Sequence, residues 1–157
     1  MGEGSTAAAE IIRLLGLEPL PGEGGYFRET YRDERSTAIL YLLEAPDFSA
    51  LHRLSGPELY HWYAGAPLAF LLLHPGGVVR SPILGPDLAA GQAPQLAVPA
   101  GVWQGSRPLG PDGAWSLVGT TMAPPFDPAG FELGRVEALS AGWPSAAERI
   151  RSLVRGS

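Results

Sequence analysis

Short apolar segments, separated by turns of glycine and proline, make up most of this 157-residue chain. The 21 Gly and 16 Pro residues fall largely in those turns. The pattern predicts strands at 37–43, 48–54, 58–64, 68–73, 78–84, 95–98, 102–107, 114–122 and 131–136. Evenly spaced short strands without helices between them favour a sandwich or a barrel, and a jelly roll closes its sheet edges in this way. We therefore expect a mainly β fold.

A short helix is predicted at each end of this strand region. Near the N-terminus, Ser5 or Thr6 can cap the first turn and Gly16 provides a stop. The apolar positions of this helix are Ile11, Leu14 and Leu15. Near the C-terminus, Ser145 and Glu148 have the spacing of a capping box, which predicts a helix over about 145–155. The buried positions expected there are Ile150, Leu153 and Val154.

The composition excludes several classes of function. All 11 basic residues are arginine, so Schiff-base catalysis and a P-loop lysine are excluded. The absence of cysteine removes thiolate nucleophiles and sulfur ligands for zinc. The net charge is −5 and the arginines are scattered along the chain, which argues against nucleic acid as a partner.

Membrane insertion and several common catalytic motifs are also not expected. No apolar run approaches the ~18 residues that a membrane-spanning helix needs. The first residues lack the basic and apolar regions of a secretory signal, so we expect a cytoplasmic protein. The sequence has no Gly-x-Ser-x-Gly elbow, no His-Glu-x-x-His and no dinucleotide-binding glycine motif between a strand and a helix.

Two motifs carry a resemblance to a known superfamily. His52, Glu58 and Gly65 resemble the first cupin motif, in which a second histidine would stand at the position of Leu54. The segment 99–104, which ends in Gln104, resembles the second cupin motif, where a histidine is usual in place of the glutamine. The resemblance therefore implies a pocket and puts the usual cupin metal in doubt.

Further segments make the resemblance more specific. They are 23–31, 38–43, 52–53, 58–67, 98–104 and 117–119. In this order they resemble the Cupin_5 family, a branch of the cupins of unknown function, from about residue 10 to about residue 135. The resemblance implies a double-stranded β-helix, or jelly-roll barrel, over about 23–137 within a single domain of residues 1–157. It further implies similarity in architecture to sugar-nucleotide epimerases of the cupin type, and a homodimer, since cupin barrels commonly pair.

Only part of the expected cupin metal ligand set is present. His52, Glu58 and Gln104 would form a nitrogen and oxygen site suited to a divalent transition ion. Leu54 removes one ligand, and the amide of Gln104 is a poor substitute for imidazole. We expect no resident metal or other cofactor, and weak divalent binding at these three residues remains the alternative.

Glu58 is the strongest candidate for a catalytic residue. Alternation along the predicted strand 58–64 places Glu58, Tyr60 and Trp62 on one face and His61 on the other. A carboxylate buried among aromatic groups has a raised pKa, which suits proton transfer. The alternative is a structural carboxylate held by Arg28 or Arg53.

The other candidate site residues each have a structural alternative. His52 matches the cupin spacing to Glu58, yet a histidine at a strand end is also commonly a hydrogen-bonded structural residue. Trp103 can stack on a sugar ring or belong to the core, and Gln104 supplies both a donor and an acceptor. Tyr26 and Arg28 are candidate ligand-binding residues at the pocket rim. Alternation groups them with Thr30, against Phe27, Glu29 and Tyr31, and does not decide which set faces the ligand.

Two classes of function follow from these residues. The first is an isomerase or epimerase, in which Glu58 or His52 removes a proton beside a carbonyl and Tyr60 returns one. The second is a non-catalytic protein that binds a polar small molecule, such as a carbohydrate or sugar nucleotide, in the barrel. A metal-dependent cupin enzyme is a further alternative, although it needs ligands that the motifs lack.

Overall fold

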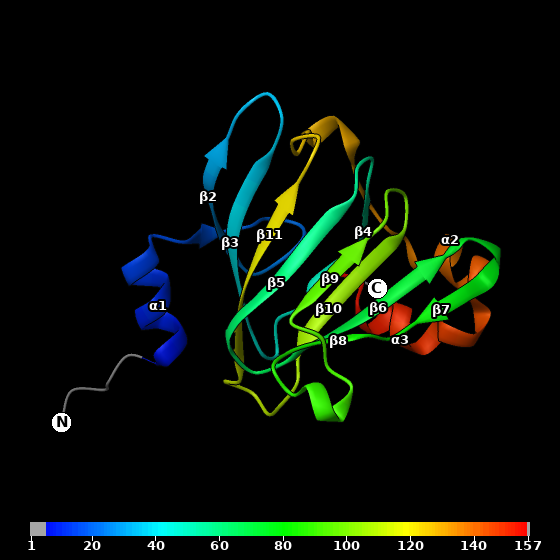
Figure 1. The fold of residues 1–157 in the computed structure, drawn as a ribbon. Helices are drawn as coiled ribbons and strands as arrows, with labels where there is room; N and C mark the ends of the chain where they lie inside the picture. Colours follow the sequence, from blue (N-terminus) through cyan, green and yellow to red (C-terminus); the bar gives the residue numbers. More distant parts are fainter. Residues whose placement is uncertain (1–5, 157) are drawn as a thin grey trace.

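Two antiparallel sheets face each other and enclose the interior of the protein in the computed structural model, which describes residues 6–156 (Figure 1). The first sheet has the order β1 (Glu18–Pro19), β2 (Tyr26–Arg32), β3 (Thr37–Glu44), β11 (Trp115–Met122), β5 (Glu58–Gly65) and β9 (Gln95–Val98). The second has the order β12 (Phe131–Leu133), β4 (Ser49–Leu54), β10 (Trp103–Pro108), β6 (Leu68–His74) and β7 (Val78–Arg80), and β8 (Ile83–Leu84) also pairs with β6. The predicted mainly β, jelly-roll architecture is confirmed.

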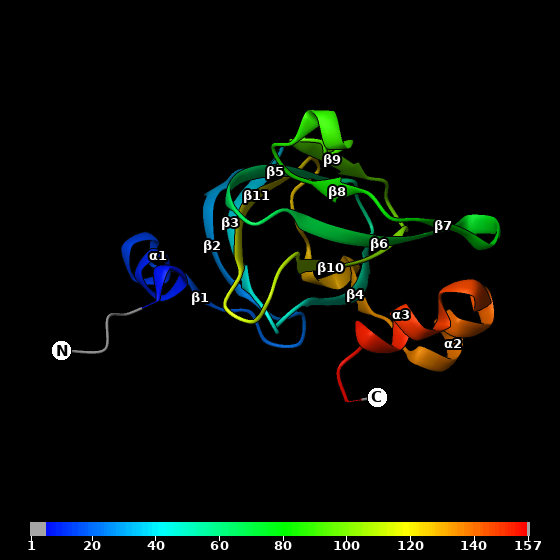
Figure 2. The same ribbon diagram turned by 90° about the horizontal axis from the view of Figure 1, so that it is seen from below.

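Helices cover the outer faces of the two sheets (Figure 2). Helix α1 (Ala7–Leu15) lies outside the first sheet, where it packs on Leu40 and Leu42 of β3. Helices α2 (Val136–Gly142) and α3 (Ala147–Ser152) lie outside the second sheet, beside β4 and β10. Short 3₁₀ turns complete the chain at η1 (Pro75–Gly77), η2 (Leu88–Ala90), η3 (Pro128–Gly130) and η4 (Pro144–Ala146).

Strand β6 is buried on both faces, and its sequence reflects this. Its residues form a continuous apolar run because both faces of the strand are covered. Leu68, Phe70 and Leu72 point into the space between the sheets, whereas Leu71 and Leu73 belong to the cluster formed with α2 and α3. A strand buried on both sides has no solvent face that would require alternation with polar residues.

The N-terminal helix agrees with its predicted cap and differs in its buried stripe. Thr6 is the N-cap, since its Oγ1 accepts a hydrogen bond of 3.1 Å from the amide of Ala9, and Gly16 ends the helix in the left-handed conformation. The alternative cap, Ser5, lies outside the described residues. Leu14, predicted to be buried, is exposed, because the packed stripe is rotated toward Ala8, Ile11, Ile12 and Leu15.

The C-terminal region differs from the prediction in the length of one strand, in an additional helix and in the start of the last helix. The predicted strand 131–136 is too long, since β12 ends at Leu133 and the unpredicted helix α2 begins at Val136. The capping box is wrong, because Pro144–Ala146 forms a 3₁₀ turn and α3 begins after it without a side-chain cap. The expected apolar face is correct: Ile150 and Leu153 are buried and Val154 packs against the same cluster.

The other predicted strands lie close to the observed ones, but β1 and β2 were not among the predicted strands. The predicted strand 78–84 is divided into β7 and β8, which pair with opposite ends of β6. Residues 85–94, between β8 and β9, contain the turn η2 and an isolated bridge between Ala93 and Leu84. Among the described residues, no helix is both long enough and apolar enough to cross a bilayer.

Candidate functional site

A cavity of about 350 Å³ opens between the two sheets. Most of its wall is apolar, formed by Leu20, Pro21, Phe27, Ile39, Leu54, Met122, Phe126, Pro128 and Phe131. Its polar lining consists of Glu23, Glu29, Arg32, Thr37, Tyr41, His52, Glu58, Tyr60 and Thr120. An apolar pocket with a few convergent polar groups is the usual form of a small-molecule site.

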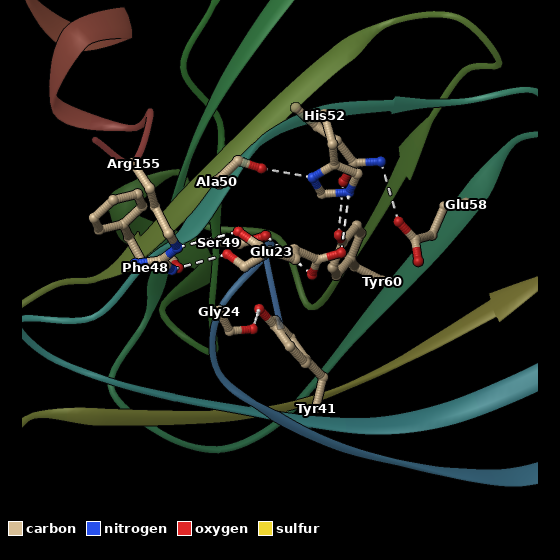
Figure 3. A network of polar contacts seen from close by, with 12 residues as sticks. Glu23, Gly24, Tyr41, Phe48, Ser49, Ala50, His52, Glu58, Tyr60 and Arg155 are labelled. Carbon is tan, nitrogen blue, oxygen red and sulfur yellow. Dashed lines mark hydrogen bonds and ion pairs between the residues drawn. The ribbon is translucent and has the colours of Figure 1, made fainter. Parts of the chain in front are cut away.

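His52 reaches this cavity from β4 of the second sheet. The side chain is only 2% exposed, and its ring stacks on Phe131 with 5.2 Å between the ring centroids. Nδ1 lies 2.7 Å from the carbonyl oxygen of Ala50, which can only accept, so Nδ1 carries a hydrogen. The other nitrogen, Nε2, lies 3.6 Å from Glu23 Oε1 (Figure 3). The backbone therefore fixes the ring so that Nε2 faces the cavity and a carboxylate.

Glu58 reaches the same cavity from β5 of the first sheet. Its Oε1 accepts a hydrogen bond of 3.1 Å from Gln104 Nε2, and Gln104 Oε1 accepts one of 2.6 Å from the hydroxyl of Tyr60 (Figure 3). Gln104 is fully buried and stands opposite His52 in the register of β10 and β4. The glutamine amide thus orients Glu58 with one end and holds Tyr60 with the other.

Burial changes the protonation of this site. Desolvation raises the pKa of the Glu58 carboxyl, and the charge of Glu23 adds to the rise, while His52 opposes it. Burial also raises the pKa of the Tyr60 hydroxyl well above its ordinary value, with Glu58 contributing to the shift. Tyr60 therefore stays protonated, and Glu58 is a stronger base than an exposed carboxylate.

The raised pKa of Glu58 predicts a dependence of stability on pH. The folded protein binds the Glu58 proton more tightly than the unfolded chain, so this group stabilises the fold below its ordinary pKa of 4.5, and that contribution is lost as pH rises through the folded pKa. Glu58→Gln removes the titration and keeps the hydrogen-bond acceptor. Urea unfolding of both proteins should show the stability of the variant rising relative to the wild type as pH increases above about 4.5. Parallel stability curves would contradict the assignment, and Glu137→Gln on the surface of α2 is the control.

Glu23 is a site residue that the sequence prediction did not single out. It lies in the glycine-rich segment between β1 and β2, which has the composition of a simple turn. Besides its approach to His52, its Oε2 accepts a hydrogen bond of 3.2 Å from Ser49 Oγ. The only sequence signal for this role was an acidic residue within the matched 23–31 segment of the resemblance.

Two predicted rim residues, Tyr26 and Arg28, lie outside the cavity. The interior face of β2 carries Phe27 and Glu29 instead. Tyr26 packs with α1 on the outer face of the sheet, and Arg28 Nη1 donates to the carbonyl oxygen of Leu15 at 3.2 Å. The register of β2 with β3 turns Phe27 and Glu29 inward, and a bulge after Glu29 then brings Arg32 rather than Tyr31 to the cavity.

Two predicted tryptophans are also outside the cavity lining. Trp62 packs against the core between the sheets beyond Tyr60, and its Nε1 donates to the carbonyl oxygen of Ala66 at 3.3 Å. Trp103 packs on the outer side of the second sheet with α2 and α3, because Gln104 takes the inward position of β10. His61 points away from the cavity, as expected from alternation, with its Nε2 3.1 Å from Thr121 Oγ1.

The residues of the motifs do not fit a metal ion. Within residues 6–156, no three His, Cys, Asp or Glu side chains are arranged to hold one. Gln104 supplies an amide in place of the usual imidazole, and that amide is already engaged: its Oε1 accepts from Tyr60 and its Nε2 donates to Glu58. The position of the remaining cupin histidine is filled by Leu54, a wall residue of the cavity.

Comparison with protein families matches residues 9–134 to Cupin_5, described as Cupin superfamily (DUF985). The matched segment includes every residue of the Glu58 network. No curated protein matches the chain in sequence.

Solved structures agree with this match. A protein from Shewanella oneidensis is 36% identical, with a TM-score of 0.88 over 98% of this chain and 99% of its own. A hypothetical protein from Leishmania major is 28% identical, with a TM-score of 0.86 over 96% of this chain and 99% of its own. An oxalate decarboxylase mutant from Bacillus subtilis is 14% identical, with a TM-score of 0.60 over 87% of this chain and 37% of its own, and it is similar in fold alone.

Proposed function

Because this chain belongs to the Cupin_5 family of the cupin superfamily, we propose that its cavity binds a polar small molecule and exchanges protons with it. The observation that carries the proposal is the approach of two titratable groups to one apolar cavity from opposite sheets. Glu58 comes from β5 and His52 from β4. Groups on opposite walls can act on opposite faces of one bound carbon atom.

This arrangement suits isomerisation or epimerisation beside a carbonyl. Glu58 removes the proton, and the carbon–hydrogen electron pair moves into the enolate. His52 returns a proton from Nε2, which faces Glu23, to the opposite face of the same carbon, where the electron pair of the enolate forms the new carbon–hydrogen bond. We assign Tyr60 a positioning part in place of the acid role expected from sequence, because its hydroxyl donates to Gln104 Oε1.

The charges of the lining favour a keto sugar whose neutral part lies deep in the cavity. Glu23 and Glu58 would repel a phosphate there. Arg32 is the only arginine among the lining residues, and it forms an ion pair of 2.7 Å with Glu29 while half-exposed. We propose that the sugar of a sugar nucleotide enters the cavity while the diphosphate stays outside, near Arg32.

A panel of keto sugars, free and as nucleoside diphosphates, tests the proposal. We expect at least one compound to raise the melting temperature and to exchange the hydrogen next to its carbonyl with deuterated water in the presence of the protein. The readouts are thermal shift and proton NMR. Binding without hydrogen exchange would show that the protein is not a catalyst for these compounds. Absence of binding across the panel would contradict the proposal that the ligand is a carbohydrate.

A non-catalytic binding protein is the second candidate function. It is favoured by the closed network of Glu58, Gln104 and Tyr60, in which the glutamine amide bonds both to the carboxylate and to the hydroxyl. A homodimer and a cytoplasmic location also remain proposals from the sequence and the resemblance.

A further inference from the structure

Arg155, which follows α3, joins two segments that are distant in sequence. Its Nε donates to the carbonyl oxygen of Gly22 at 3.1 Å and its Nη2 to that of Glu23 at 2.9 Å. The same Nη2 contacts Asp47 Oδ1 at 2.9 Å and the carbonyl oxygen of Phe48. The guanidinium also lies 4.2 Å above the Phe48 ring (Figure 3). One side chain therefore clasps the 22–25 loop to the turn before β4.

The loop that Arg155 holds is the one that carries Glu23. Its other contacts lead to the same turn and to β3 and β4. Gly25 donates its amide to Asp47 Oδ2 at 2.9 Å, and the Tyr41 hydroxyl donates to the carbonyl oxygen of Gly24 at 2.6 Å. The backbone of Glu23 is fixed by the amide of Ala50, which donates to its carbonyl oxygen at 2.8 Å.

The backbone at Gly24 packs closely against the Arg155 side chain. Its φ of +105° lies in the region that favours glycine, and a Cβ at this position would clash with the Arg155 guanidinium and the Phe48 carbonyl oxygen. The loop backbone is therefore shaped around the arginine side chain.

We propose that Arg155 is a positioning residue that holds Glu23 against His52 from outside the cavity. This inference rests on the proposed pairing of His52 with Glu23 in proton transfer. The effect comes mainly from the hydrogen bonds to backbone carbonyls, because the ion pair with Asp47 is more than one-third exposed and such pairs contribute little. A planar guanidinium can serve several carbonyl oxygens at fixed angles, which a lysine ammonium cannot do in the same geometry.

NMR of the ligand-free protein tests the proposal without any substrate. The chain has only 3 His residues, so the His52 ring signals can be assigned by comparison with His52→Gln. We expect Arg155→Ala to shift the His52 Nε2 resonance and to speed hydrogen exchange of the Gly25 amide about tenfold, through loss of charge-assisted hydrogen bonds. Arg155→Lys should give intermediate changes.

Arg149→Ala is the matched control. Arg149 lies on α3 and donates to Ser81 Oγ and the carbonyl oxygen of Phe70, away from the 22–25 loop. It should leave the His52 and Gly25 signals unchanged. The proposal is overturned if Arg155→Ala leaves the His52 resonance in place, with or without faster exchange at Gly25. If Arg155→Ala does not fold, an unchanged His52 resonance in Arg155→Lys overturns it equally.

These outcomes are separate from those of the proposed function. A keto-sugar panel that shows no binding leaves the His52 and Gly25 measurements intact. Conversely, if the protein is catalytically active but its His52 signal does not change in the Arg155 variants, the proposed function stands and the positioning role of Arg155 is wrong.

Discussion

Glu58→Gln should reduce hydrogen exchange of a bound keto sugar by roughly 10²–10⁴-fold, the usual contribution of a positioned general base. The amide keeps the volume of the side chain and can still accept the hydrogen bond from Gln104 Nε2. It cannot remove a proton, so the variant should retain its fold and its ligand. The readouts are proton NMR for exchange, circular dichroism for the fold and thermal shift for binding.

Glu29→Gln is the matched control for this loss. Glu29 lines the same cavity at its rim, where its carboxylate pairs with Arg32. Its replacement should leave exchange at the deep carbon within a few-fold of the wild type, since a rim group does not touch the reacting carbon. If the Glu58→Gln variant still exchanges the ligand hydrogen at the wild-type rate, Glu58 is not the base.

Trp103→Ala should destabilise the protein by about 3–5 kcal/mol without reducing ligand affinity. Trp103 is only 8% exposed and packs with Leu139 of α2 and Ile150 of α3 on the outer face of the second sheet. Arg53 lies 4.7 Å above its ring from the solvent side. Loss of the indole leaves a void between the sheet and the helices, whereas the cavity lies on the other side of the strand.

Chemical denaturation measures the stability change, and thermal shift at saturating ligand measures binding in the fraction that folds. Trp62→Ala is the comparison variant, because Trp62 is half-buried against the core between the two sheets rather than between the second sheet and the helices. Loss of binding in Trp103→Ala at unchanged stability would contradict its outer position and restore the stacking role expected from sequence.

The sequence predicted most of the strands because burial on one or both faces leaves a clear apolar pattern. Strand β2 was not predicted, since its residues are half-buried or exposed. The run in β6 and the spacing of turns were sufficient to locate most of the sheet. The helix α2 was missed because only Leu139 among its residues is buried, so its apolar pattern is weak. The turn Pro144–Ala146 shifted the start of α3 past the capping residues, which the local pattern could not reveal.

The site was predictable only where alternation and motif position agreed. His52, Glu58 and Gln104 come together because β4, β5 and β10 turn these positions inward. Tyr26 and Phe27 are adjacent and equally aromatic, and only the pairing of β2 with β3 decides which of them faces the cavity. Glu23 belongs to a loop whose path is set by Arg155, more than a hundred residues later, and no local pattern contains that information.

A crystal structure with the keto sugar that gives the largest thermal shift tests the central claim most directly. The protein should be purified without affinity-column metals. We expect ligand density inside the cavity, with the carbon next to the carbonyl between Glu58 and His52 Nε2 and no metal ion beside them. Ligand bound elsewhere on the surface, or a metal held by His52 and Glu58, would contradict it.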